Sequence, residues 1–148
     1  MELLQCGMKS VTIGYSINIT PRDLANAIGC LRDNTSLKEL TIWTETDQSE
    51  NIQDVTEEDV LTSVEQAVKE NTTLERLEVN SERRTMKWRN VAESILKGAA
   101  ANQNLRELKL VMNEEYKEYA PKQEVIDNVR KVNKKLRLTV VLVFGNYL

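Results

Sequence analysis

The stretch that decides the fold is residues 61–79, which read LTSVEQAVKENTTLERLEV. Up to Asn71 the apolar residues are spaced three or four apart, as on one face of a helix. After it, Leu77 and Val79 alternate with polar residues, as in a strand. The same helix–asparagine–strand pattern returns elsewhere in the chain. A short repeated unit cannot bury its apolar face alone, so the pattern predicts an architecture of stacked repeats.

The whole chain, residues 1–148, reads as a single domain made of such units. A partial unit, a strand without its helix, is followed by four full ones, and the five cover residues 8–19, 20–55, 56–87, 88–119 and 120–148. In the first three full units the helix closes at Asn34, Asn71 and Asn102. Asparagine suits a helix end because it tolerates a left-handed backbone.

The fourth full unit can be aligned in two ways. With Asn133 at the closing position, polar residues such as Asp127 and Thr139 fall on core positions. With Lys135 there, the core positions are apolar throughout, namely Val125, Val129, Val132, Leu138, Val141 and Val143. The second alignment is our prediction, and it turns Val140 and Leu142 away from the core.

The strand segments share the pattern Leu-x-x-Leu-x-Leu, with aliphatic substitutes, and begin at Leu37, Leu74, Leu105 and Leu138. Together with the helices that end in asparagine, they resemble the leucine-rich repeat in the long subclass of ribonuclease inhibitor. That subclass also occurs in NACHT-type receptors, tropomodulins and the GTPase-activating protein of Ran. The resemblance implies an α/β horseshoe arc, a solenoid with about five parallel strands on the concave face and about four helices outside.

The sequence departs from this family at one position. Eight residues after the first leucine of the strand motif, where the family has an asparagine that bridges neighbouring turns, this chain has Glu45, Glu82, Asn113 and Asn146. A carboxylate cannot donate the same hydrogen bonds. We therefore expect wider turns after the first two of these strands.

The candidate partner-binding residues are those that alternate with the core residues along each strand and so face the concave side. They are Glu39, Thr41, Trp43, Arg76, Glu78, Asn80, Glu107, Lys109, Val140 and Leu142. A tryptophan beside an arginine is common at binding hot spots. The alternative is that these are ordinary solvated sheet residues and that Trp43 packs beneath the connection that follows it.

Two connections are strongly charged. Residues 45–59 carry seven carboxylates and no base. They form either a calcium or docking loop or a solvated acidic rim, and their spacing does not match an EF-hand. Residues 82–89 carry four bases and Trp88, which either contact an anionic partner or place Trp88 as a hydrophobic staple before a helix.

The sequence offers little for catalysis. It has no histidine, its five glycines are not clustered, and Cys6 and Cys30 are too far apart for a metal motif. We expect no enzyme activity, no cofactor and no metal site, and a buried free thiol at Cys30. The net charge of −3 argues against nucleic-acid binding.

The location expected from the sequence is the cytoplasm. No apolar run reaches the ~18 residues that span a membrane, and no signal peptide is visible at the N-terminus.

The last strand, from Leu138 to Phe144, is apolar on both faces, and the free edge of such a strand invites pairing. Residues 144–148 cap that edge, the chain is a fragment of a longer array, or the edge is an interface, for instance of a homodimer. The leading functional hypothesis is a non-enzymatic protein–protein interaction module, as in the recognition arc of a cytosolic innate-immune-type receptor or an adaptor. The alternatives are a tropomodulin-like, cytoskeletal actin binder and a self-assembling structural module that uses the C-terminal strand.

Overall fold

The computed structural model describes residues 7–14, 19–44, 53–81, 87–113 and 120–143. Strands and helices alternate along the chain. In order, they are β1 (Ser10–Ile13), α1 (Pro21–Gly29), the short 3-10 helix η2 (Cys30–Arg32), β2 (Glu39–Trp43), α2 (Glu58–Glu70), β3 (Arg76–Ser81), α3 (Arg89–Ala101), β4 (Glu107–Asn113), α4 (Gln123–Val132) and β5 (Arg137–Val143).

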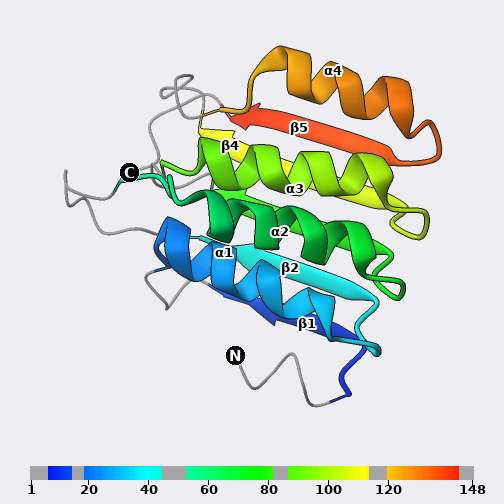
Figure 1. The fold of residues 1–148 in the computed structure, drawn as a ribbon. Helices are drawn as coiled ribbons and strands as arrows, with labels where there is room; N and C mark the ends of the chain where they lie inside the picture. Colours follow the sequence, from blue (N-terminus) through cyan, green and yellow to red (C-terminus); the bar gives the residue numbers. More distant parts are fainter. Residues whose placement is uncertain (1–6, 15–18, 45–52, 82–86, 114–119, 144–148) are drawn as a thin grey trace.

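The five strands form one parallel sheet in the order β1-β2-β3-β4-β5, so each strand pairs with the next one in sequence. The four α-helices lie side by side over one face of this sheet (Figure 1). The prediction of an α/β fold with five parallel strands and four helices is confirmed. Equivalent positions of successive strands lie side by side, as Leu40, Leu77 and Leu108 do.

The core lies between the sheet and the helices and is mainly aliphatic. Leu40, Leu77 and Leu108 from the strands are fully buried, as are Ile28 and Ile95 from the helices facing them. Each such side chain removes enough apolar surface from water to contribute about 2 kcal/mol. The core therefore grows by one layer with every unit.

Two further expectations concern single residues of this core. Trp88, directly before α3, is only 1% exposed, so it belongs to the core and is not a contact residue for a partner. Cys30 is a free thiol, but it is half-buried rather than buried as expected.

A ladder of asparagine side chains joins the units where each helix ends. The side-chain amide of Asn71 donates to the carbonyl oxygens of Leu31 and Asn34, at 2.7 and 3.2 Å. Its own side-chain oxygen accepts from the backbone N–H groups of Thr73 and Leu74, at 3.0 and 2.7 Å. The last carbonyls of one helix are thus satisfied by the next unit.

Asn102 repeats these contacts. Its amide donates to Val68 and Asn71, at 2.7 and 2.9 Å, and its oxygen accepts from Asn104 and Leu105, at 2.7 and 2.6 Å. The reason we gave for asparagine is wrong, because no described residue other than glycine has a positive φ. The side chain, with one donor group and one acceptor, is what the position requires.

The alignment predicted for the fourth full unit is also wrong. Asn133, not Lys135, continues the ladder, with its amide 2.9 Å from the carbonyl oxygen of Ala99 and 3.0 Å from that of Asn102. On α4 the buried residues are Ile126 and Val129. Val132, expected in the core, is 60% exposed.

In that unit the strand β5 begins one residue sooner after its ladder asparagine than β4 does after Asn102. Leu138 pairs with Leu108, although it follows its ladder asparagine by five residues, whereas Leu108 follows Asn102 by six. The residues of β5 that pack against the core are therefore Leu138, Val140 and Leu142. Val141 and Val143, assigned to the core from sequence, are on the opposite face.

Helices α2 and α3 approach closely at Gly98. A Cβ atom on this glycine would lie 2.5 Å from the carbonyl oxygen of Glu65 and 2.8 Å from the Cβ of Val68. Neither contact leaves room for a side chain, so glycine is required here by packing and not by backbone conformation.

Candidate binding surface on the sheet

The candidate site is the far face of the sheet, which we define as the face turned away from the helices. The pairing of β2, β3, β4 and β5 arranges its residues in three rows that run across the strands. The charged row is Glu39, Arg76, Glu107 and Arg137; the middle row is Thr41, Glu78, Lys109 and Thr139; and the apolar row is Trp43, Asn80, Val111 and Val141.

An ion-pair network occupies the centre of this face. The Arg76 guanidinium lies 2.6 Å from a Glu78 carboxylate oxygen and 3.4 Å from one of Glu107. Lys109 Nζ lies 3.9 Å from the other oxygen of Glu78, whose side chain is only 9% exposed. The charges of the two bases and the two acids thus cancel, and each charged side chain has a partner. Such a network contributes more to a fixed surface shape than to attraction of a charged partner.

Trp43 lies apart from this network. Its neighbour on β3 is Asn80, while Arg76 is the neighbour of Glu39 at the other end of β2. Four residues of strand correspond to roughly 13 Å. The expected hot spot of a tryptophan beside an arginine is therefore wrong. Trp43 is half-buried at the end of the apolar row.

The other candidate residues differ widely in exposure. Glu39 is exposed, and Thr41, Arg76, Glu107 and Lys109 are half-buried. Glu78 and Asn80 are buried, and the backbone oxygen of Asn80 accepts from both the N–H and the hydroxyl of Thr44, at 2.8 and 3.2 Å. Val140 and Leu142 do not belong to this face.

Sequence reasoning missed the residues that β5 does present on the far face, namely Arg137, Thr139, Val141 and Val143. A signal for them existed in the chain. Leu136 follows Asn133 by three residues, as Leu105 follows Asn102, but Leu138 follows Leu136 by two residues where Leu108 follows Leu105 by three. Leu136 is buried, so the shift lies between Leu136 and Leu138. Counting from both ends of the unit would have found the shift.

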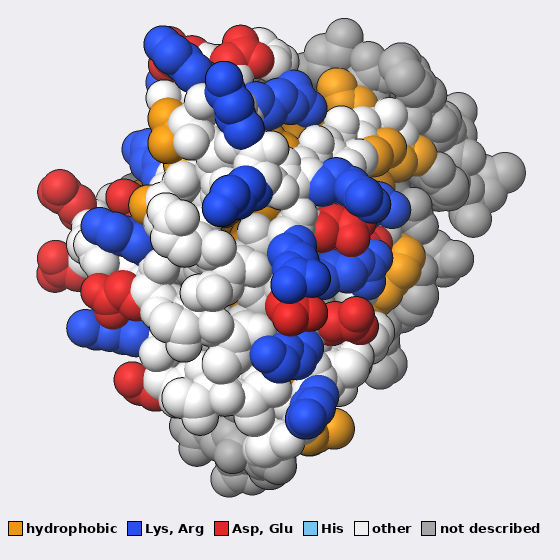
Figure 2. All heavy atoms as spheres, turned by 90° about the vertical axis from the view of Figure 1, so that its right-hand side faces the viewer, with side chains coloured by type: hydrophobic (Ala, Val, Ile, Leu, Met, Phe, Trp, Pro, Cys, Tyr) orange, Lys and Arg blue, Asp and Glu red, His pale blue; other side chains and the backbone are white. Residues whose placement is uncertain are grey.

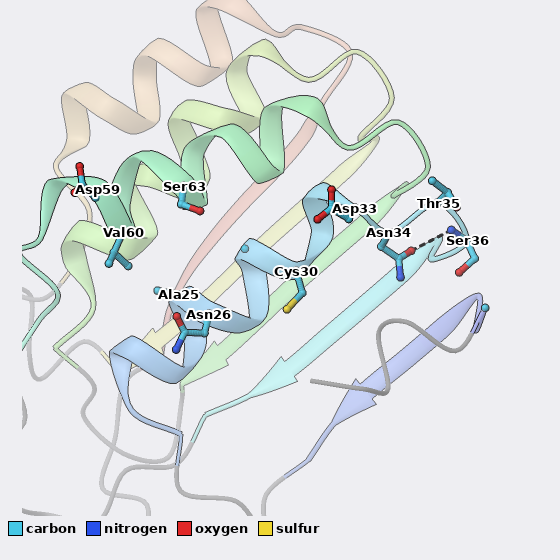
Figure 3. A pocket seen from close by; sticks show the side chains of 12 residues that line it. Ala25, Asn26, Cys30, Asp33, Asn34, Thr35, Ser36, Asp59, Val60 and Ser63 are labelled. Atoms are coloured by element: carbon cyan, nitrogen blue, oxygen red, sulfur yellow. Dashed lines mark hydrogen bonds between the residues drawn. The ribbon is translucent and has the colours of Figure 1, made fainter.

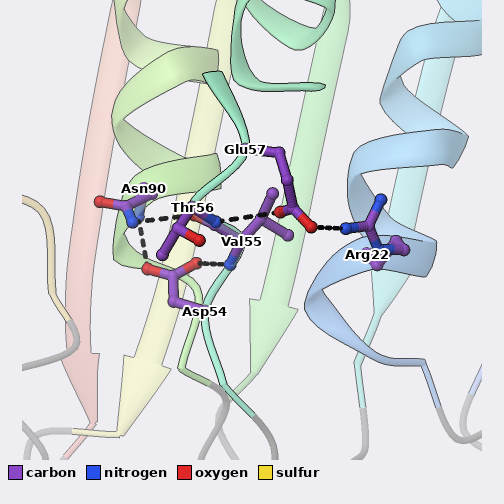
Figure 4. Close-up of polar contacts among 6 residues, drawn as sticks. All are labelled: Arg22, Asp54, Val55, Thr56, Glu57 and Asn90. Atoms are coloured by element: carbon purple, nitrogen blue, oxygen red, sulfur yellow. Dashed lines mark hydrogen bonds and ion pairs between the residues drawn. The ribbon is translucent and has the colours of Figure 1, made fainter. Parts of the chain in front are cut away.

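The described part of the acidic connection has structural partners (Figure 4). The Asp54 carboxylate accepts from the backbone N–H of Asn90, in the first turn of α3, at 2.7 Å and from that of Val55 at 2.8 Å. The side-chain amide of Asn90 donates a hydrogen bond to the Val55 carbonyl oxygen at 2.8 Å. Asp54 therefore caps α3, the helix of the unit that covers residues 88–119. Residues 45–52 of this connection, including Glu45, lie outside the described residues, as do residues 82–86, the side chain of Asn113, and Asn146.

Two acids of this connection have shifted pKa values. Burial raises the pKa of Asp54, against the lowering effect of the hydrogen bonds from Asn90 and Val55. The pKa of Glu57 is lowered by a hydrogen bond from its own backbone N–H and by Arg22, which forms an ion pair with it. Both shifts follow from contacts within the connection and with its neighbouring elements.

A groove of about 780 Å³ lies between α1, α2 and the turn before β2 (Figure 3). Its lining includes Cys30, Asp33 and Asp59 but no Lys, Arg or His. The side-chain oxygen of Asn34 is occupied by the backbone N–H groups of Ser36 and Leu37.

The described residues contain no group of three or more His, Cys, Asp or Glu residues arranged to hold a metal ion. None of the helices in the described ranges has the length and apolar character needed to cross a membrane.

No protein-family model matches the chain, and no curated protein matches it either.

Proposed function

We propose that this chain is a leucine-rich-repeat arc of the ribonuclease-inhibitor-like subclass and that it binds a protein partner, without catalysis, through the far face of its sheet. Support for the repeat family comes from units stacked in sequence order and from the asparagine ladder that joins them. A cytoplasmic location is part of the proposal, and the free thiol of Cys30 is compatible with it.

The observation that carries the binding proposal is the apolar row beside a neutral network. Trp43 and Val141 are half-buried at its two ends, on β2 and β5. All four described α-helices cover the opposite face (Figure 1). Parallel sheets normally have both faces covered, so a partner on the far face would complete a familiar arrangement. The ordered charges next to the row would then select among partners.

The test compares two double variants that each replace two apolar side chains by serine. Trp43→Ser with Val141→Ser removes the ends of the apolar row, and Met8→Ser with Val132→Ser removes two exposed large apolar side chains elsewhere in the described residues. Wild type and both variants serve as baits, with cross-linking and mass spectrometry to identify the bound protein and the contact. The proposal requires a partner that cross-links to the far face and is lost only from the first variant.

Circular dichroism first establishes that each bait is folded. A partner held equally by all three baits, or lost equally from both variants, contradicts the proposal.

A second candidate function is self-assembly through β5, which is the last strand of the described sheet and has seven mostly apolar residues. Light scattering across a range of concentrations tests it. A dimer that Val141→Lys converts to a monomer favours this candidate. A monomer at every concentration removes it.

A further inference from the structure

A basic groove lies at the edge of the sheet where the helix-to-strand turns enter β4 and β5. It has a volume of about 500 Å³, and its basic side chains are Arg106, Lys135 and Arg137. The backbone N–H of Arg137 donates to the carbonyl of Arg106 at 2.8 Å, so the two arginines are held on neighbouring chain segments. All three side chains are exposed.

Two bases of the groove, Lys135 and Arg137, lie in a basic part of the chain. Residues 120–143 contain six bases and two acids, a net charge of +4, in a chain whose net charge is −3. Figure 2 views the edge that carries these turns, and basic side chains gather toward its top, where α4 and β5 lie. Lower on the same edge, acidic and basic side chains are mixed.

The positive charges on α4 have a structural role, whereas those of the groove do not have that role. Arg130 and Lys131 are in the last turn of α4, where cations stabilise the helix dipole. Arg106, Lys135 and Arg137 lie outside the helices. Within the described residues, no carboxylate forms an ion pair with any of these three.

The acid within the groove does not neutralise it. Glu107 lines the groove, but Arg76 lies 3.4 Å from its carboxylate. Three bases near one another repel, and an anion bound between them would relieve that repulsion.

We propose that the basic groove binds an acidic peptide segment of a partner protein. Two guanidinium groups can each take a carboxylate in a two-pronged hydrogen bond. The exposed amide side chains of Gln103 and Asn104, which also line the groove, can bond the peptide backbone. This surface is distinct from the apolar row, and the inference does not depend on binding there.

A nucleic acid fits the groove less well. None of its lining residues is aromatic, whereas single-stranded nucleic acids gain much of their affinity by stacking bases on aromatic rings. A duplex or a long strand would also extend over the mixed charges beside the groove and over a protein that is acidic as a whole.

The experiment measures binding of a fluorescein-labelled peptide of alternating Asp, Glu and Leu residues by anisotropy, at low and at physiological salt. It compares wild type with two triple variants of equal charge change. The groove variant is Arg106→Glu, Lys135→Glu and Arg137→Glu, and the control variant is Lys9→Glu, Lys69→Glu and Lys97→Glu, which changes exposed lysines elsewhere. We expect the groove variant to bind at least about tenfold more weakly and the control to stay within about threefold of wild type.

Absence of binding by wild type, or an equal loss in both triple variants, overturns the proposal. A uridylate oligonucleotide or phosphatidylserine vesicles that bind more tightly than the peptide, and lose binding in the groove variant, also overturn it in favour of another anionic partner. If circular dichroism shows that the groove variant is unfolded, Lys135→Ala with Arg137→Gln replaces it. The far-face variant Trp43→Ser with Val141→Ser should bind the peptide like wild type, which keeps the two proposals separable.

Discussion

The unit closed by Asn102 and the unit closed by Asn133 share a helix end but not a strand. Both asparagines donate to two carbonyls of the preceding unit. Asn102 is 2% exposed, whereas Asn133 is half-buried, and the strand after Asn133 reaches its sheet register one residue sooner. The comparison teaches that two independent devices position each unit. Side-chain hydrogen bonds place the end of the helix, and pairing with the preceding strand places the next one.

The largest expected difference between the two units is at the ladder itself. Asn102→Ala leaves two carbonyls and two N–H groups without their partners in a buried place, so we expect a loss of about 4 kcal/mol in the free energy of unfolding. Asn133→Ala should lose about 1.5 kcal/mol, because water reaches a half-buried site. Urea denaturation of both variants measures the difference. Equal losses in the two variants would show that Asn102 and Asn133 contribute equally to stability, against the difference proposed between the two units.

The second difference lies in how closely the helices pack. Gly98 is four residues before Asn102, and the equivalent residue before Asn133 is Val129. Gly98→Ala should therefore force α2 and α3 apart and lower the free energy of unfolding by about 3 kcal/mol. Gly29→Ala is the control, because its Cβ would lie 3.9 Å from the Ser63 hydroxyl, an ordinary contact. We expect the control to be neutral or to gain up to about 1 kcal/mol in thermal melts analysed for stability. A similar loss in both would mean that glycine is needed for another reason.

The third prediction tests which way β5 faces. Leu142 packs against the core and Val141 does not, so Leu142→Lys should lower the free energy of unfolding by about 2 kcal/mol. Val141→Lys should change it by about 0.5 kcal/mol or less. Guanidinium denaturation of the pair measures both values. The reverse order would restore the alignment with Lys135 at the closing position.

The smallest effects concern how the unit closed by Asn102 begins. Asp54→Ala removes the acceptor for the N–H groups of Asn90 and Val55, and we expect a loss of about 1 kcal/mol at neutral pH. Asp54→Asn keeps an acceptor oxygen without the buried charge. Because burial raises the folded-state pKa of Asp54 above its ordinary value, the folded state binds the proton more tightly than the unfolded state. The stability that this shift contributes is present below the ordinary pKa and is lost as the pH rises through the folded-state value.

As the pH rises through the folded-state pKa of Asp54, the wild type should therefore lose stability relative to Asp54→Asn. Urea titrations from pH 3 to pH 7 measure this difference. A wild type that gains relative to Asp54→Asn on raising the pH would show that the hydrogen bonds outweigh burial.

Much of the fold was predictable from sequence, because the change of apolar spacing at each asparagine marks where a helix gives way to a strand. The alternation of Leu77 and Val79 also gave the correct core face of β3. The last unit was not predictable by spacing alone, since one residue lost after Asn133 moves every later side chain of β5 to the other face. Counting apolar residues favoured the alignment with valines, whereas the ladder hydrogen bonds fix the helix end at Asn133 and the strand pairing fixes the face of β5.

The candidate site was predicted less well than the fold. Alternation identified the far-face residues of β2, β3 and β4, but exposure depends on neighbours in other strands. Glu78 is buried because it lies between Arg76 and Lys109, which only the strand register brings together. The separation of Trp43 from Arg76 also follows from that register.

The asparagine ladder gives the molecule a direction in which it tolerates shortening. Every bridging amide donates toward the N-terminal side, from Asn71 to Asn34, from Asn102 to Asn71 and from Asn133 to Asn102. Deleting the last unit uncovers carbonyl oxygens, which accept hydrogen bonds from water readily. Deleting the first full unit removes the acceptors of the Asn71 amide, but the Asn71 oxygen keeps the N–H groups of Thr73 and Leu74. Because each helix end is held by the unit that follows it, loss of a later unit frees the helix end before it, and loss of an earlier unit does not.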